Sequence, residues 1–197
     1  MGFDLYGLNP VENSVLDEDA AKFQDEDGWA RFDMMNDKDK DRYFKAQDKY
    51  HASNPGVYFR NNVWGWRPLW EYVCLQCEDI LSHKDMVNGS YNDAHKISKT
   101  KSKKIAARLR KLIKNGYVTR YKNNRQQHID ELPLIECDIC DGTGFRKKAP
   151  KTGAGDVECN GCNDGKKEQW ETSYPFDTEN VIRFSAFCED SGGFEIC

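Results

Sequence analysis

The sequence has no long apolar run. Hydrophobic residues make up 38% of the 197-residue chain, which allows only a small core. No stretch approaches the roughly 18–20 apolar residues that span a bilayer. The opening residues Met1–Tyr6 also lack the basic start and apolar stretch of a secretory signal. We therefore expect a cytoplasmic protein with no membrane partner.

Signatures of catalysis are also missing. The chain contains no Gly-x-Ser-x-Gly, phosphate loop, dinucleotide fingerprint or His-Glu-x-x-His. The zinc-deaminase signature is missing as well. A catalytic interpretation would centre on His95, preceded by Asn92 and Asp93. The alternative, which we favour, is that Asn92 and Asp93 form a turn and His95 is an exposed loop residue. The sequence leans toward a protein that is not an enzyme.

Cysteine, in contrast, is plentiful, with eight residues. In a reducing compartment, paired cysteines indicate metal ligation or redox chemistry more often than disulfides. Four of them follow the spacing Cys-x2-Cys, 18 residues, Cys-x2-Cys. Two intervening residues let a tight turn direct both sulfurs at one ion, and four thiolates leave no open position for water. We predict one structural Zn²⁺, with a rubredoxin-like iron site or a redox dithiol pair as alternatives. The ligands would be Cys137, Cys140, Cys159 and Cys162.

The first of these two cysteine pairs resembles a known repeat. Cys137–Gly144 matches the C-x-x-C-x-G-x-G repeat of the DnaJ-type chaperone cysteine-rich domain, and Cys159–Lys166 keeps the cysteines but shifts the glycine by one. That family carries four repeats and two zinc ions, whereas this chain supplies two repeats and no His-Pro-Asp signature of a J domain. The resemblance covers residues 137–166 and implies a zinc hairpin rather than a chaperone.

More broadly, the chain looks similar to small phage-encoded proteins of undescribed function. The similarity lies in Met1–Pro10, in Tyr58–Trp64 and in the Gly-Gly-Phe near the end. It implies an accessory role during infection, in the host cytoplasm, and it says nothing about mechanism.

The other four cysteines allow two interpretations. They could form a second metal site together with a histidine, or they could be buried free thiols that act as small hydrophobic side chains. We favour the second interpretation. These residues are Cys74, Cys77, Cys188 and Cys197.

Aromatic residues concentrate at 58–72. Asn61-Asn62 suggests a hairpin turn, with Trp64 and Trp66 on one face of its second strand, and Pro68 would begin a helix that runs to about residue 81. Core packing is the favoured interpretation. The alternative is a stacking platform for a nucleotide, with Arg60 or Arg67 on its phosphate.

Charge is strongly segregated along the chain. Residues 1–50 carry 13 acidic and 7 basic side chains, whereas residues 96–125 carry 12 Lys or Arg and no acid. A helix over 98–115 would bear one basic stripe, and a strand over 117–121 would give the outline of a winged helix-turn-helix. Segment 96–125 could bind nucleic acid or a host protein, or could be a solvated face that balances the acidic region. The basic stripe is Lys101, Lys104, Arg108 and Lys111.

These patterns predict a compact α+β fold with short strands and three to four helices. Residues 1–132 would form the core, with an acidic excursion over 11–53, and residues 133–170 the zinc hairpin. A helix from about Thr178 and a final strand, within 171–197, would pack back on the core. The inward residues of that helix would be Val181, Ile182, Ala186 and Phe187.

Three functions follow in order of preference. The first is a phage-associated, zinc-stabilised binding protein that acts through segment 96–125 on nucleic acid or a host macromolecule. The second is a nucleotide-binding or nucleotide-cleaving protein that uses the aromatic cluster 58–72. The third is a virion or assembly component.

Overall fold

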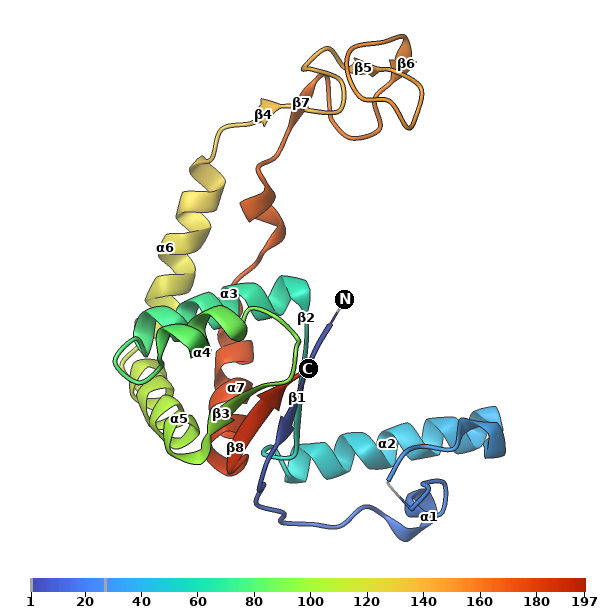
Figure 1. The fold of residues 1–197 in the computed structure, drawn as a ribbon, viewed down its shortest axis with the longest axis vertical. Helices are drawn as coiled ribbons and strands as arrows, with labels where there is room; N and C mark the ends of the chain where they lie inside the picture. The colour runs from blue at the N-terminus through green and yellow to red at the C-terminus, as the bar shows by residue number, and fades with distance from the viewer. Residues whose placement is uncertain (1, 27) are drawn as a thin grey trace. The chain divides into compact units, whose positions relative to one another are not determined.

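The computed structural model describes residues 2–26 and 28–197. The chain divides into two compact units, one formed by residues 1–119 together with 177–197, and the other by residues 120–176. The first unit contains the main sheet and most of the helices, and the second contains the predicted metal ligands (Figure 1). Each unit is described by itself.

A four-stranded antiparallel sheet organises the first unit. Its order is β2-β1-β8-β3, formed by β1 (Gly2–Gly7), β2 (Tyr58–Asn62), β8 (Gly193–Ile196) and β3 (His95–Ser98). On β1, Leu5 pairs with Phe59 on one side and with Ile196 on the other. Because side chains alternate along a strand, Phe3 and Leu5 are buried on one face, whereas Asp4 and Tyr6 lie on the other.

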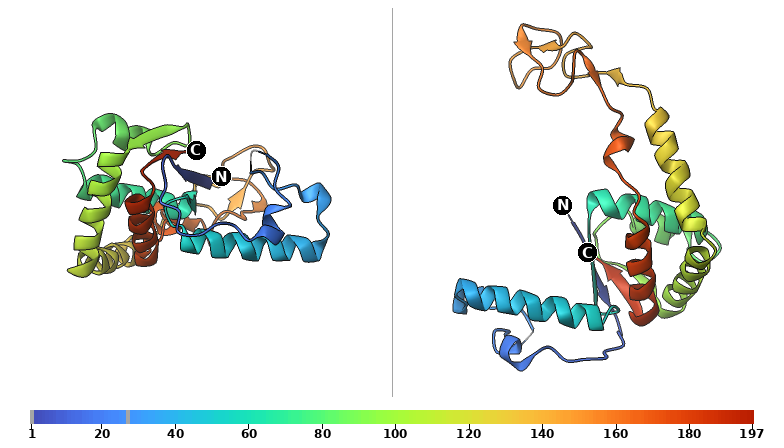
Figure 2. Two further views of the ribbon diagram at one scale, coloured as in Figure 1. Left: turned by 90° about the horizontal axis from the view of Figure 1, so that it is seen from below. Right: turned by 180° about the vertical axis from the view of Figure 1, so that it is seen from behind.

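Three helices cover the buried face of this sheet: α3 (Val63–Gln76), α5 (Lys99–Lys114) and α7 (Thr178–Asp190) (Figure 2). Aromatic rings fill the space between the helices and the strands. Trp66 stacks on Phe3 and Trp70, at centroid distances of 5.4 and 5.3 Å, and Phe184 meets Trp66 edge-on at 5.7 Å. Other fully buried side chains are Leu69, Ile97, Ile105, Leu109, Phe187, Phe194 and Ile196.

Helix α3 corrects the predicted hairpin. The helix begins at Val63 rather than at Pro68, because the Asn62 side chain caps it by accepting a 2.8 Å hydrogen bond from the Gly65 N–H. The strand before it, β2, therefore pairs with β1 and not with residues 63–66. The helix ends at Gln76, before residue 81, and Pro68 lies inside it.

The basic helix forms as predicted, but the strand after it does not. Ser98 caps α5, and Gly116 follows its end with a φ of 72°. Residues Tyr117–Glu131 then form a further helix, α6, so the outline of a winged helix-turn-helix is wrong. Pairs four residues apart support this helix locally, for example Gln126 with Asp130 at 2.8 Å.

The acidic excursion contains two helices, α1 (Glu18–Ala21) and α2 (Asp37–Ser53), and both are largely exposed. Asn36 and Asp39 form a reciprocal capping box at the start of α2. A small satellite core of Ala20, Met35 and Tyr43 holds the excursion together.

Helix α7 has the predicted length, but its buried face is rotated. Val181 and Phe187 are buried as expected, whereas Ile182 and Ala186 face outward. Phe184 and Cys188 take their places inside, because α7 packs between the sheet and α5. The residue that caps the helix is Asp177, not Thr178.

The α+β class is confirmed, but the described residues form seven α-helices rather than three or four. The additional helices are the short α1, the one-and-a-half-turn α4 (His83–Asn88) and α6. None of the helices in the described part of the chain is long and apolar enough to cross a membrane. The second unit has only two-residue strands: β4 (Ile135–Glu136), β5 (Phe145–Arg146), β6 (Val157–Glu158) and β7 (Lys166–Lys167).

Two neighbouring tryptophans test this arrangement. Trp66 is fully buried, whereas Trp64 is 47% exposed. We expect Trp66→Ala to lower the free energy of unfolding by about 3–5 kcal/mol, and Trp64→Ala to lower it by less than about 1 kcal/mol. Urea denaturation measures both. Equal losses would contradict the helical register of α3.

Candidate functional site

The structure brings the four predicted metal ligands together. The sulfurs of Cys137, Cys140, Cys159 and Cys162 all lie within 4.8 Å of one another. The Cys137 and Cys159 sulfurs are 3.9 Å apart, and those of Cys140 and Cys162 are 3.7 Å apart. These separations are far beyond the roughly 2.05 Å of a disulfide. They match the spacing of about 3.8 Å that a tetrahedron with metal–sulfur bonds of about 2.3 Å requires.

Two backbone hydrogen bonds, one from each side, connect the two cysteine knuckles, residues 137–144 and 159–166. The Cys137 N–H donates to the Gly165 carbonyl at 2.8 Å, and the Cys159 N–H donates to the Gly144 carbonyl at 2.9 Å. Each knuckle therefore supplies the glycine carbonyl that orients the first cysteine of the other. The sulfur cluster rests on this pseudo-symmetric pairing.

The shifted glycine of the second knuckle has a structural explanation. Asn163 and Lys166 exchange two 2.9 Å backbone hydrogen bonds around Asp164 and Gly165, whose φ angles are 47° and 79°. Two successive positive φ angles define a type I′ turn, for which Asp-Gly is a preferred pair. A Cβ on Gly165 would also lie 1.9 Å from the Gly142 carbonyl oxygen, so no larger residue fits there.

The donor set suits a thiophilic metal ion, and its shell is closed. Burial opposes ionisation of the Cys140 thiol, but the Gly144 N–H and the neighbouring thiols outweigh that effect and lower its pKa to about 7. Cys137, Cys140 and Cys159 are also the buried hydrophobic cluster of this unit, packed against Ile139. Four protein sulfurs leave no coordination position for a substrate, which is the arrangement of a structural site.

The other four cysteines do not join a second cluster. Within residues 2–26 and 28–197, only the four cysteines above form a group that could hold a metal ion. Cys77 and Cys188 are fully buried, and burial raises the pKa of Cys74 and of Cys77 to about 12. Burial thus disfavours the thiolate form of these cysteines, which is the form that reacts and binds metal. Cys197 is half-buried beyond β8.

Most of the aromatic cluster belongs to the core. Phe59, Trp66, Trp70 and Tyr72 are buried, and the Trp66 and Trp70 indole N–H groups donate to the Gly89 and Met86 carbonyls. Trp64 and Trp66 do not share a strand face, because both lie on α3. Arg67 is exposed on the same helix. Arg60 lies on the outer face of the sheet, 3.6 Å from the Asp4 carboxylate.

The basic stripe of α5 separates into two parts. Lys101 pairs with Asp85, and Arg108 forms a two-pronged contact with Asp79 at 2.8 and 3.1 Å. Lys104 and Lys111 are exposed. The sequence could not show this division, because the two acids lie on a distant loop and on α4.

His95 is partly buried rather than an exposed loop residue. Its Nε2 lies 3.0 Å from the Asp85 carboxylate, which also accepts from the Ser82 hydroxyl at 2.6 Å and from Lys101. This buried carboxylate joins α4, β3 and α5. Sequence reasoning missed Asp85, although the capping box of Ser82 and Asp85 is a readable local signal. Asp93 is exposed.

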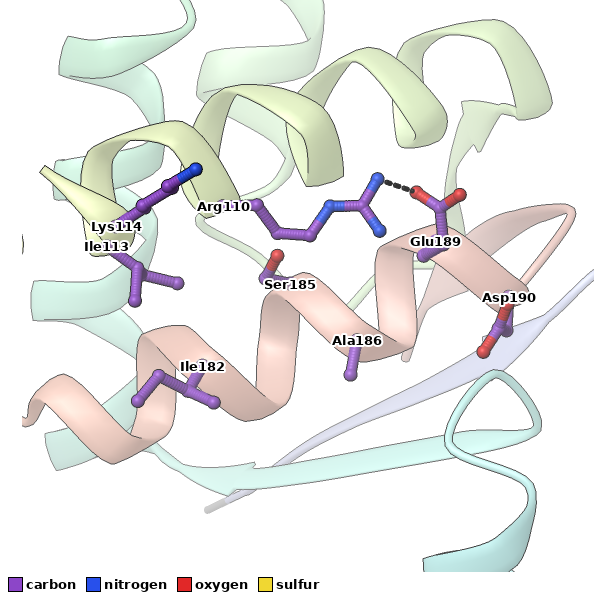
Figure 3. A pocket seen from close by; sticks show the side chains of 8 residues that line it. All are labelled: Arg110, Ile113, Lys114, Ile182, Ser185, Ala186, Glu189 and Asp190. Atoms are coloured by element: carbon purple, nitrogen blue, oxygen red, sulfur yellow. Dashed lines mark hydrogen bonds and ion pairs between the residues drawn. The ribbon is translucent and has the colours of Figure 1, made fainter.

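A shallow groove between α5 and α7 has a volume of about 400 Å³ (Figure 3). Ile113, Ile182 and Ala186 line it, and an Arg110–Glu189 ion pair of 2.7 Å bridges its walls. The Ser185 hydroxyl donates to the Ala106 carbonyl at 3.2 Å. The groove thus contains no paired nucleophile and base, which a hydrolytic site needs.

No protein-family model matches the chain, and no curated protein or solved structure shows significant similarity to it. The resemblances to DnaJ-type repeats and to small phage-encoded proteins therefore stay predictions.

Metal content tests the cysteine site. We expect one zinc per chain by elemental analysis, and loss of that zinc in Cys159→Ser because one of four thiolates is removed. Without metal, residues 120–176 should lose their amide dispersion in NMR spectra while the other unit keeps its own. Cys74→Ser is the matched control and should keep the zinc. A folded 120–176 unit in metal-free Cys159→Ser would refute the assignment.

The Asp85 carboxylate predicts a pH dependence of stability. Burial opposes its ionisation, but hydrogen bonds from Lys101, Ser82 and His95 outweigh burial and hold its pKa well below the usual range. Its stabilisation is therefore present above the unfolded pKa of about 3.9 and is lost as pH falls below that value. We expect Asp85→Asn to cost about 2 kcal/mol at pH 7 and clearly less at pH 2.5, by urea denaturation. The exposed Asp93→Asn should change little at either pH. A loss independent of pH would contradict the ionic role of Asp85.

Proposed function

We propose that this protein is a zinc-stabilised, non-enzymatic binding protein whose helix α5 contacts the backbone of a nucleic acid. One observation carries the proposal. Four lysines lie on the side of α5 opposite the buried Ile105 and Leu109, and among the described residues none of the four forms an ion pair, although Lys104 lies near enough to Asp79 to help lower the pKa of that carboxyl. They are Lys103, Lys104, Lys111 and Lys114.

Their arrangement supports contact with phosphates. The four lysines lie within residues 103–114, and the first and last are about 16 Å apart along the helix. Duplex DNA carries about one charge per 1.7 Å of its axis, so such a row faces several phosphates. The ion pairs of Lys101 and Arg108 flank the row and leave the outermost cations available. The net charge of −4 does not oppose this, because segment 96–125 carries 12 Lys or Arg and no acid, and all the acids lie elsewhere in the chain.

The cysteine site supports the stabilising part of the proposal. A closed set of four thiolates favours zinc over ions that need an open or oxygen-rich site. Zinc would then hold residues 120–176 folded and take no part in binding. The resemblance to small phage-encoded proteins supports an accessory role in an infected host cell. The lysines of α5 favour nucleic acid over a host protein as the partner there.

The alternative nucleotide site at residues 58–72 has less support. Four of its six rings are buried in the core, so only Trp64 and the half-buried Tyr58 are accessible to a base. An assembly role would need a partner surface that nothing in the described residues singles out.

Salt-dependent binding tests the α5 surface. In fluorescence anisotropy with unrelated duplex DNA, we expect affinity to fall steeply with salt. The fourfold change of Lys103, Lys104, Lys111 and Lys114 to Gln should weaken binding roughly ten-fold or more and reduce the salt slope by about 3–4, because each phosphate contact contributes about 0.9.

The matched control changes four lysines of α2 to Gln, namely Lys38, Lys40, Lys45 and Lys49. This control removes the same charge from a different helix and should keep most of the binding and of the slope. Equal losses in the two variants would indicate a net-charge effect and contradict the assignment to α5. Absence of binding at low salt would contradict the proposal as a whole.

A further inference from the structure

The outer face of the main sheet is the one that α3, α5 and α7 do not cover. Among the described residues of the first unit, these three helices pack on one side of the sheet, whereas α2 meets the opposite side at its C-terminal end, through His51 (Figures 1 and 2). The register places Asp4 opposite Arg60, Tyr6 opposite Tyr58, and Glu195 opposite Lys96 on this outer face. The outer face therefore presents aromatic rings and charged side chains together.

Three rings gather around Tyr58 on this face. Tyr6 on β1 and Tyr58 on β2 have centroids 5.3 Å apart, and His51 near the end of α2 lies 5.2 Å from Tyr58. The Tyr58 hydroxyl donates to the Asp4 carboxylate, which fixes that ring in place. Tyr6 is 42% exposed. A planar group could thus cover Tyr6 next to a ring that is already positioned.

On the outer face, the basic side chains are more exposed than their acidic partners. The side chains of Arg60 and Lys96 are 71% and 62% exposed, whereas their acidic partners Asp4 and Glu195 are only 34% and 26% exposed. The acids lie closer to the sheet and the cations project from it. An approaching polyanion would therefore meet the guanidinium and the ammonium group first.

The edge strand of this face, β3, leads along the chain into the lysine-rich helix, which itself packs on the other side of the sheet. Strand β3 carries Lys96 and ends at Ser98, which caps α5, and the exposed Lys99 and Lys103 follow directly. Aromatic rings that stack on bases, next to cations that contact phosphates, are the recurring arrangement of single-strand binding surfaces. Duplex bases are stacked on each other and could not reach Tyr6.

We infer that the outer face of the sheet binds single-stranded nucleic acid, with an unpaired base stacked on Tyr6 beside Tyr58 and with phosphates on Arg60 and Lys96. This inference rests on the proposed function and adds to it the strandedness of the ligand and a second surface. Aromatic stacking supplies the preference for single strands, while the α5 lysines attract either form.

The test uses a single-stranded oligonucleotide that contains 2-aminopurine, whose fluorescence is quenched when the base stacks on an aromatic ring. We expect the wild-type protein to quench it and Tyr6→Ala to abolish the quenching, with roughly ten-fold weaker binding of the single strand. Binding of duplex DNA by Tyr6→Ala should be unchanged. Tyr6→Phe keeps the ring and should behave as wild type.

Two further variants separate stacking from charge and from general loss of an aromatic side chain. The joint change of Arg60 and Lys96 to Gln should lower the salt slope of single-strand binding by about 1.4, at about 0.7 for each phosphate. Tyr91→Ala removes a 59%-exposed tyrosine from the loop between α4 and β3, outside the Tyr6–Tyr58 pair, and should change nothing. Circular dichroism and thermal denaturation confirm that each variant is folded.

The outcomes distinguish this inference from the proposed function. If Tyr6→Ala quenches and binds as wild type, the inference is overturned, while loss of duplex binding in the α5 variant still supports the proposed function. If Tyr6→Ala loses single-strand binding and the α5 variant keeps duplex binding, only the proposed role of α5 fails. The inference would also be overturned if the protein bound a neutral oligosaccharide but no oligonucleotide, and if Tyr6→Ala lost that oligosaccharide binding.

Discussion

The pairing of β1 with both β2 and β8 is the constraint on which the first unit depends. Leu5 is buried between Phe59 and Ile196, so three distant segments of the chain must meet before the sheet exists. The same pairing decides the two faces of the molecule. Once Phe3 and Leu5 are turned toward the aromatic core, the two-residue period of a strand turns Asp4 and Tyr6 toward solvent. One strand register thus determines both the buried core on one face of the sheet and the proposed single-strand surface on the other.

Residues 120–176 are held by a different interaction. The cluster around the cysteines consists of sulfurs and Ile139, the strands are two residues long, and the large buried side chains Tyr174 and Phe176 lie outside this cluster. A knuckle region of this kind has little apolar area of its own, and a metal ion held by the four cysteines would stabilise it. Because four thiolates would close the shell, we assign a stabilising role to this unit and place the proposed binding surfaces in the other.

Charge explains how a protein with an acidic average can present a basic surface. Asp79 and Asp85 form ion pairs with Arg108 and Lys101 at the edge of α5, and the lysines at the centre of its exposed side form no ion pair among the described residues. On the sheet, Asp4 and Glu195 position Arg60 and Lys96 from below. In both places the acids orient cations, and the cations are the groups that a partner would reach first.

The sequence by itself determined the features that depend on local spacing. The cysteine pairs, the helix between Ser98 and Gly116, and the last strand were all predictable, because each depends on turn geometry, capping or periodicity within a few residues. Only the tertiary structure decided which partners those elements meet. The Asn62 cap turned a predicted hairpin into α3, packing rotated α7 so that Phe184 replaced Ile182 inside, and the register of β1 exposed Tyr6. Pairing and burial are choices among segments far apart in the chain, and local periodicity carries no information about that choice.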